Sequence, residues 1–165
     1  MSSLDLSKLS SRNYTVPFDG RTVDFDVTEL MNILKTNDYE TIIGYISNHI
    51  NDSDINTIFH DVIIESINSR SNDLLSMYVV SYCTNLRVFE YLYNKGIHFS
   101  DTKDVEINNY QCTMDRNPIH CACYVSTVDV VKFIYEKHPD QINTQTYSNN
   151  SCIEIACENG NIDII

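Results

Sequence analysis

This sequence has little glycine, proline or basic character, and it has no tryptophan. Its 165 residues include four glycines and three prolines, and 23 acidic residues stand against 11 basic ones. The glycines are isolated, so no glycine-rich loop is available to bind a phosphate group. The formal net charge of −12 argues against nucleic acid as the main ligand, because phosphate binding relies on Lys and Arg. The charge fits a basic protein partner, and it also keeps the chain soluble whatever the partner.

Long apolar segments are missing as well. The first eight residues contain no apolar run long enough for a signal peptide, and no segment approaches the length of a membrane span. The six cysteines include no Cys-x-x-Cys pair, and cysteines used for packing are typical of a reducing compartment. We therefore expect a soluble intracellular protein without a membrane partner, and the cytoplasm is favoured over the nucleus.

One stretch of the chain occurs twice. Segment 117–123, Asn-Pro-Ile-His-Cys-Ala-Cys, is similar to segment 151–157, Ser-Cys-Ile-Glu-Ile-Ala-Cys. Segment 128–131 is likewise similar to segment 162–165, and all matching positions are 34 residues apart. A fixed period of this size predicts stacked units that each contain two helices.

Local signals mark the helix ends of both copies. Asn117 is a good N-cap residue, and Pro118 suits the first helical position, where a missing N–H costs nothing. Ser151 and Glu154 have the spacing of a capping box. Gly160 falls where the first helix of the second copy ends, and glycine suits the left-handed conformation found there.

The two copies resemble the ankyrin repeat, whose core pattern is Thr-Pro-Leu-His-x-Ala-Ala-x-x-Gly-His-x-x-Val-Val. The matching residues are Pro118, Ile119, His120, Ala122, Val130 and Val131 in the first copy, and Ile153, Ala156, Gly160 and Ile164 in the second. The departures are Asn117, Ser126, Cys152 and Glu154, which replace Thr, Gly, Pro and His. The resemblance implies an all-α solenoid of stacked helix pairs and a structural role for His120 in bonding the turn.

Two degenerate copies precede these. The first covers about 28–49, with Asn37 at the position where a left-handed turn residue is expected. The second ends at Gly96, where ankyrin repeats commonly place glycine after their second helix. An amphipathic stretch at 55–68 is then one helix too many. Either this stretch is inserted, or it pairs with 72–83 and leaves the helix that follows unpaired; the sequence leaves both possibilities open.

The remaining N-terminal residues divide into two parts. Residues 1–13 are polar and expected to be flexible. Segment 14–27 combines an Asp-Gly turn dipeptide with alternating apolar and acidic residues, which predicts a short β-hairpin that caps the stack; an extended arm is the alternative. The repeat domain then spans 28–165. Its last repeat is incomplete, so we interpret the chain as a fragment of a longer repeat protein.

Neither a metal site nor a catalytic site is predicted. His120, Cys121 and Cys123 suggest zinc together with Cys112, but Cys121 and Cys123 point about 200° apart on a helix and cannot readily share one ion. A cysteine nucleophile needs a partnered histidine in an electropositive setting, which this acidic chain does not offer. Cys123 and Cys157 share one repeat position, which we expect to be small and buried. We therefore expect no enzyme activity and no cofactor.

The resemblance implies a non-catalytic module that binds another protein through loop tips and the concave surface of its inner helices. The first loop tip belongs to 97–116, the longest connection, for which a surface insertion without function is the alternative. By position, the partner-binding residues are Tyr110, Gln111, Asp115 and Arg116 on this tip, Tyr147, Ser148, Asn149 and Asn150 on the next, and Cys121, Tyr124, Val125, Glu158 and Asn159 on the inner helices. Alternatives are an adaptor or regulatory domain of a longer protein, whose effector or enzymatic part is absent, and self-association through the C-terminal edge.

Overall fold

The fold is helical, as predicted, with three short strand pairs beside the helices. The computed structural model describes residues 14–15, 22–23, 27–61, 63–65, 72–99, 106–107, 110–111, 117–146 and 148–165. Within these ranges the α-helices are α1 (Val27–Leu34), α2 (Tyr39–His49), α3 (Ile55–Asp61), α4 (Leu75–Tyr82), α5 (Leu86–Asn94), α6 (Pro118–Val125), α7 (Val128–Lys137) and α8 (Cys152–Glu158). Two 3₁₀ helices, η2 (Pro139–Asn143) and η3 (Ile162–Ile164), complete the helical elements there.

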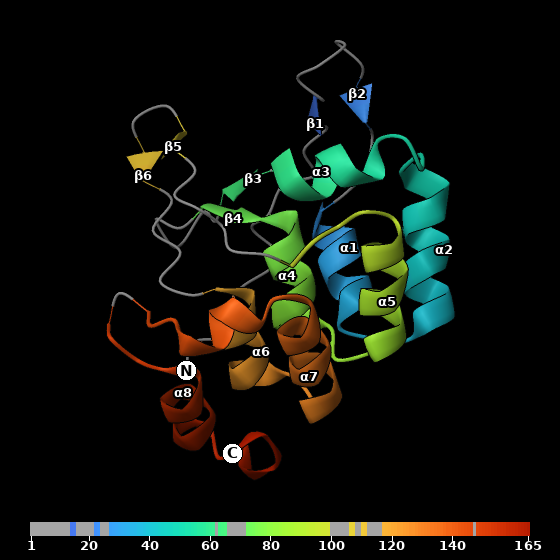
Figure 1. Ribbon diagram of the computed structural model, residues 1–165. Helices are drawn as coiled ribbons and strands as arrows, with labels where there is room; N and C mark the ends of the chain where they lie inside the picture. The colour runs from blue at the N-terminus through green and yellow to red at the C-terminus, as the bar shows by residue number, and fades with distance from the viewer. Residues whose placement is uncertain are drawn as a thin grey trace.

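The helices lie in two rows. In the inner row, α1 contacts α4, α4 contacts α6, and α6 contacts α8. In the outer row, α2 contacts α5, α5 contacts α7, and α7 contacts η3 (Figure 1). The rows pack on each other through α1 on α2, α6 on α7 and α8 on η3. Apart from α3 and η2, successive helices of the described chain thus alternate between the inner row and the outer row.

Helix α3 lies outside both rows. It contacts α4 and β4 (Asn72–Leu74), whereas α5 lies between α2 and α7 in the outer row. Helix α5 therefore follows α4 as the second helix of its unit, and α3 is the additional helix. The contacts answer the question that the sequence left open.

The prediction of a helix over 55–68 is wrong for the second half of that segment. Helix α3 ends at Asp61, and β3 (Ile63–Glu65) pairs antiparallel with β4, with Ile63 opposite Leu74. Ile63 and Ile64 are β-branched, and β-branched residues favour an extended backbone over a helix. Because their apolar side chains fit either structure, hydrophobic periodicity did not distinguish the two.

Two shorter strand pairs lie at other points of the chain. β1 (Tyr14–Thr15) pairs antiparallel with β2 (Thr22–Val23), with Tyr14 opposite Val23. Of the hairpin predicted for 14–27, the structure describes these four residues and Val27, which begins α1; the Asp-Gly turn lies outside the described residues. β5 (Glu106–Ile107) pairs antiparallel with β6 (Tyr110–Gln111) within the long connection after α5.

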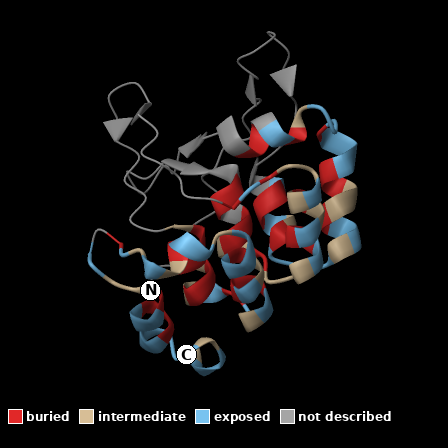
Figure 2. Cartoon of the chain, viewed as in Figure 1, coloured by how far each residue is buried: buried red, intermediate tan, exposed pale blue. Residues whose placement is uncertain are grey.

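A continuous apolar core fills the space between the rows. Figure 2 shows the buried residues on the sides of the helices that face their neighbours and the exposed residues on the outward sides. Each large side chain buried in this way contributes roughly 1.5–3 kcal/mol to the stability of the fold. The core runs through every unit and includes Leu30, Ile42, Ile46, Val80, Phe89, Leu92, Ile119, Ala122, Val130, Ile134, Ile155 and Ala156.

The turn residues expected from the sequence adopt the predicted backbone. Asn37, Gly96 and Gly160 have φ values of 54°, 91° and 68°. Asn37 also joins two units, because its side-chain oxygen accepts a hydrogen bond from the Thr84 backbone N–H at 2.7 Å. Its own carbonyl accepts a second bond from the Asn85 side chain, also at 2.7 Å.

Candidate functional site

The interior of the last units is organised around a buried histidine. His120 is fully buried on α6, and its Nδ1 accepts a hydrogen bond from the Asn117 backbone N–H at 3.1 Å. Its Nε2 lies 3.1 Å from the Thr144 carbonyl oxygen and donates to it, because a carbonyl can only accept. The ring is therefore neutral, and both nitrogens are occupied by backbone groups. These two bonds tie His120 to the turn before α6 and to the segment after η2.

A buried glutamine supports the same turn from the other side. Gln141 in η2 is almost fully buried. Its amide nitrogen donates to the Phe99 carbonyl at 2.9 Å, and its amide oxygen accepts from the Ile119 N–H at 3.4 Å. This side chain links the segment after α5 to the start of α6. Sequence analysis did not single out Gln141, and a lone glutamine in a polar connection carries no signal that would have done so.

The α8–η3 unit is tied to α6 by one asparagine. The Asn161 side chain donates to the carbonyls of Cys123 and Ser126, at 3.3 Å in each case. Helix α8 itself begins with the predicted capping box, since Glu154 accepts from the Ser151 N–H at 2.7 Å and Ser151 Oγ accepts from the Glu154 N–H at 3.3 Å. The Asn161 bonds hold the α8–η3 unit against the end of α6, and the capping box stabilises the first turn of α8.

Five of the predicted contact residues lie on the inner row, and we call them the inner strip. On α6, Cys121 and Tyr124 are half-buried, and Val125 is 39% exposed. Glu158, the last residue of α8, and Asn159, its C-cap, are exposed. Tyr124 and Glu158 occupy equivalent positions of the two units, as do Val125 and Asn159. The structure therefore brings these five residues to the accessible sides of two neighbouring helices.

The second predicted loop tip is a closed turn. Ser148 and Asn149 are exposed, Asn150 is half-buried, and Tyr147 lies outside the described residues. The Thr146 N–H donates to the Asn150 carbonyl at 3.0 Å, and the Asn149 N–H donates to the Thr146 carbonyl at 2.9 Å. Asn149 has a φ of 61°, which asparagine tolerates better than most residues. This turn precedes α8 and presents a rigid polar tip beside it.

The first predicted loop tip is described only in part. Tyr110 and Gln111 form β6 and pair with Ile107 and Glu106, and Figure 1 shows β5 and β6 apart from α6 and α8. Asp115 and Arg116 lie outside the described residues. The structure therefore does not bring Tyr110 and Gln111 together with the inner strip.

One position of the repeat was predicted wrongly. Cys157 was expected to be buried like Cys123, but it is exposed, whereas Cys123 is fully buried. Helix α6 packs against α4 and against α8, and the main contact of α8 with the inner row is with α6. Cys157 is on the side of α8 that the described residues leave uncovered. Equivalent positions in a repeat therefore share a backbone geometry without sharing an environment.

Charge is distributed unevenly between the rows. The four inner-row helices contain no Lys or Arg, and their charged residues are three glutamates, Glu29, Glu154 and Glu158. Within the helices the structure describes, the basic residues Arg87, Lys132 and Lys137 are all on the outer row. The charged residues of the inner-row helices are therefore all acidic.

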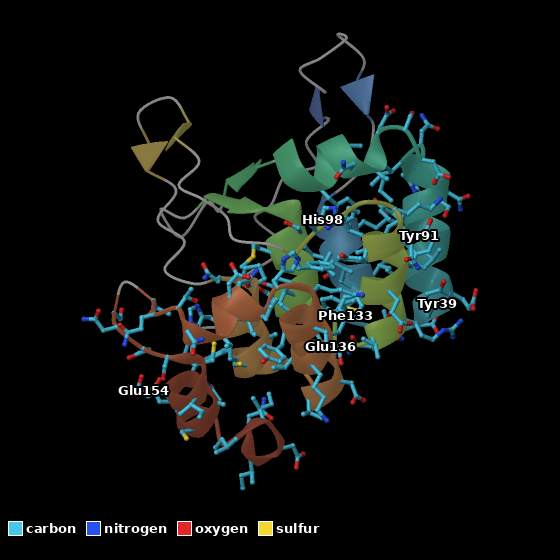
Figure 3. The ribbon with its side chains drawn as sticks, in the orientation of Figure 1. Tyr39, Tyr91, His98, Phe133, Glu136 and Glu154 are labelled. Atoms are coloured by element: carbon cyan, nitrogen blue, oxygen red, sulfur yellow. The ribbon has the colours of Figure 1, made fainter. Side chains whose placement is uncertain are left out.

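A hollow of about 350 Å³ lies on the outer row between α2 and α5. Tyr39 and Tyr91, labelled in Figure 3, form part of its lining together with two cations. Arg87 stacks on the Tyr39 ring at 3.9 Å from its centroid. Lys95 donates to Asp52 at 2.6 Å, and this bond raises the pKa of the Lys95 ammonium. Because these cations already hold partners, the hollow has no free charge for an anion.

Two cysteine thiols meet where α6 and α8 pack together. Cys123 is fully buried, Cys152 is 4% exposed, and their side chains are hydrogen-bonded to each other. The bond from Cys123, together with one from His120, lowers the pKa of the Cys152 thiol. The same shared proton and the burial of the site raise the pKa of Cys123. Among the described residues, no three His, Cys, Asp or Glu side chains are grouped as a metal site.

Comparisons with known proteins return nothing similar to this chain: no family model, no curated protein and no solved structure matches it. In the described part of the chain, no helix combines the length and apolar character that a membrane span requires. The assignment of a function therefore rests on the geometry and charge described above.

Proposed function

We propose that this chain is a non-catalytic protein-binding module of the ankyrin type, and that the inner strip and the adjoining turn at 148–150 contact a basic segment of a partner. The observation that carries the proposal is the alignment of Tyr124 with Glu158 and of Val125 with Asn159 on neighbouring inner-row helices. A surface assembled from equivalent positions of stacked units can extend along a partner that no single helix could contact.

The rigidity of the strip supports the proposal. Asn161, His120 and Gln141 fix the two units and the turn before α8 through buried or partly buried hydrogen bonds. A surface that is already ordered loses little conformational entropy on binding, which favours affinity. The exposed side chains would then contact the partner, and the packed helices would hold them in position, as is usual for binding residues on a rigid scaffold.

The charge of the inner row supports a basic partner. Glu154 and Glu158 are exposed there, and no Lys or Arg of an inner-row helix opposes them. Complementary charge raises the rate of association and selects among partners, and a salt-dependent affinity follows from it.

A photo-crosslinking comparison tests the location of the contact. A photoreactive phenylalanine replaces Tyr124 in one variant and Tyr135, which is 45% exposed on the outer row, in a second. Both variants are incubated with lysate and irradiated, and covalent adducts are identified by mass spectrometry. We expect a partner-specific adduct at position 124 and none at position 135. Adducts at 135 alone would place the binding surface on the outer row and overturn the proposal.

Charge reversal then measures the contribution of the strip. For the captured partner, Glu158→Lys on α8 is expected to weaken binding on the order of tenfold, whereas Glu136→Lys on the outer helix α7 leaves it unchanged. Figure 3 labels Glu136 on α7, away from α8. Equal losses from both variants would indicate a general charge effect and contradict a specific inner-row site.

A further inference from the structure

A second hollow lies beside the last unit, and most of its lining is apolar. It has a volume of about 420 Å³ and is bounded by α7, η2 and η3. Six of its eight lining residues are apolar or aromatic, and two of these, Tyr135 and Ile165, are exposed. Exposed apolar side chains that gather around a hollow indicate a contact surface. We call this surface the α7–η3 hollow.

The α7–η3 hollow has one cation and one anion, which belong to different elements. Lys132 is exposed on α7, and Asp163 is exposed on η3. Neither side chain forms an ion pair with another residue that the structure describes. The whole chain has a formal net charge of −12, so two copies repel each other over most of their surface. At this hollow the side-chain charges cancel, which suits a second copy better than a basic partner.

Equivalent positions of the last two units show what the hollow lacks. Val131 of α7 is buried beside η3, which packs on α7, whereas its counterpart Ile165 is exposed. In a linear stack, a position of this kind is buried by the outer-row element of a neighbouring unit. A second copy of the chain supplies such an element in its own α7, whose side at the hollow is already apolar.

We propose that two copies of this chain associate through the α7–η3 hollow as a weak two-fold symmetric dimer, in which Lys132 of each copy pairs with Asp163 of the other. A two-fold axis that runs along the hollow, between α7 and η3, places α7 of one copy against η3 of the other. The exposed Tyr135 and Ile165 side chains of both copies are then removed from water. The inference does not depend on the proposed binding function, which uses the inner row.

Charge exchange between two variants tests the pairing. Lys132→Glu leaves two anions at the hollow, and Asp163→Lys leaves two cations there, so each variant alone should dimerise about tenfold more weakly than the unsubstituted chain. When the two variants are mixed, their hollows have opposite charges, and a mixed dimer should form at least as well as the original one. Sedimentation velocity over a wide range of concentrations provides the measurement. Circular dichroism verifies that each variant is folded.

The same variants separate a specific pairing from a general charge effect. Lys132→Glu makes the chain more acidic and Asp163→Lys makes it less acidic, so repulsion between whole chains would change in opposite directions. The proposed pairing requires both substitutions to weaken association. Lys137→Glu is the matched control, because Lys137 is an exposed residue of α7 that does not line the hollow. We expect this control to change the dissociation constant by no more than about twofold.

Crosslinking in the purified chain locates the contact. With a photoreactive phenylalanine in place of Tyr135, irradiation at high concentration should link two copies, and the link should map to η3 of the other copy. Adducts between two copies differ in mass from adducts with another protein, so this proposal and the proposed binding function fail separately. A chain that remains monomeric at every concentration would overturn the dimer and leave the hollow to a different occupant. Association that mixing does not restore would overturn it as well, because the contact would then lie elsewhere.

Discussion

The α6–α7 unit and the α8–η3 unit have related sequences but occupy different environments. Ile119 is fully buried, and its counterpart Ile153 is 59% exposed; Val131 is 8% exposed, and its counterpart Ile165 is 59% exposed. Ala122 and Ala156, in contrast, are both fully buried. The small alanine faces the interior of its own unit, whereas the isoleucine and valine positions face the next unit.

This difference separates two contributions to stability. Residues that pack within a unit are buried in both copies, and residues that pack between units are buried only where a neighbour is present. In a linear stack the stability is approximately a sum of these two terms. Substitutions at matched positions therefore measure each term in turn.

The largest effect is expected from a charge in the interior unit. Ala122→Asp places a carboxylate between helices and costs on the order of 3–5 kcal/mol, because the charge has no partner there. Ala156→Asp can avoid most of that cost by releasing α8 and η3 from α6. Thermal melting followed by circular dichroism should show a loss of the main transition for Ala122→Asp. The main transition of Ala156→Asp should persist with a reduced helical signal, and an unchanged melt for Ala122→Asp would contradict the register.

A second comparison concerns the surface between units. Ile119→Ala removes a fully buried side chain, and we expect it to lower the free energy of unfolding by about 2–5 kcal/mol. Ile153→Ala removes an exposed one, and we expect a change within about 0.5 kcal/mol. Urea unfolding of both variants provides the measurement. Equal losses would mean that Ile153 is covered in solution by a surface that the described residues do not include.

The hydrogen bonds between units are expected to have a smaller effect. Asn161→Ala removes both side-chain donors to α6 and its C-terminal turn, which costs about 1–2 kcal/mol locally. Amides of α8 should then exchange several-fold faster, while those of α4 and α5 do not change. Asn159→Ala is the matched control, because its side chain donates only to Ile155 within the same helix, at 2.8 Å. Faster exchange throughout the chain would show that Asn161 supports more than the last unit.

The comparison also shows which features a sequence can predict. The caps at Asn117 and Ser151 and the left-handed backbone of Asn37 follow from local chemistry, and the structure confirms them. The exposure of Cys157 could not be predicted, since it depends on whether another helix covers α8. The contacts of Asn161 and Gln141 could not be predicted either. Their partners are backbone carbonyls and amides, which nearly every residue has, so the sequence does not identify them.

The same reasoning applies to the candidate site. The inner strip was located by repeat position; Val125, Glu158 and Asn159 are exposed, and Cys121 and Tyr124 are half-buried. The influence of Cys123 on the pKa of Cys152 was not predicted, although the replacement of proline by Cys152 at the start of α8 was visible as a departure from the pattern. The predicted C-terminal end of the helix at 55–68 was wrong, because the apolar residues Ile63 and Ile64 are compatible with either a helix or a strand.

The smallest expected effect is the pH dependence of the capping box on α8. The Ser151 N–H and hydroxyl both donate to Glu154, and these bonds lower the pKa of its carboxyl below its ordinary value. A lowered pKa in the folded state means that the carboxylate stabilises α8 fully above the pKa of the unfolded chain. That contribution is lost as the pH falls through the pKa of the folded state. An NMR titration of the Glu154 side chain should give a midpoint below 4.5. Ser151→Ala should raise this midpoint only part of the way, because the backbone donor remains; a full return to the ordinary value would assign the effect to the hydroxyl alone.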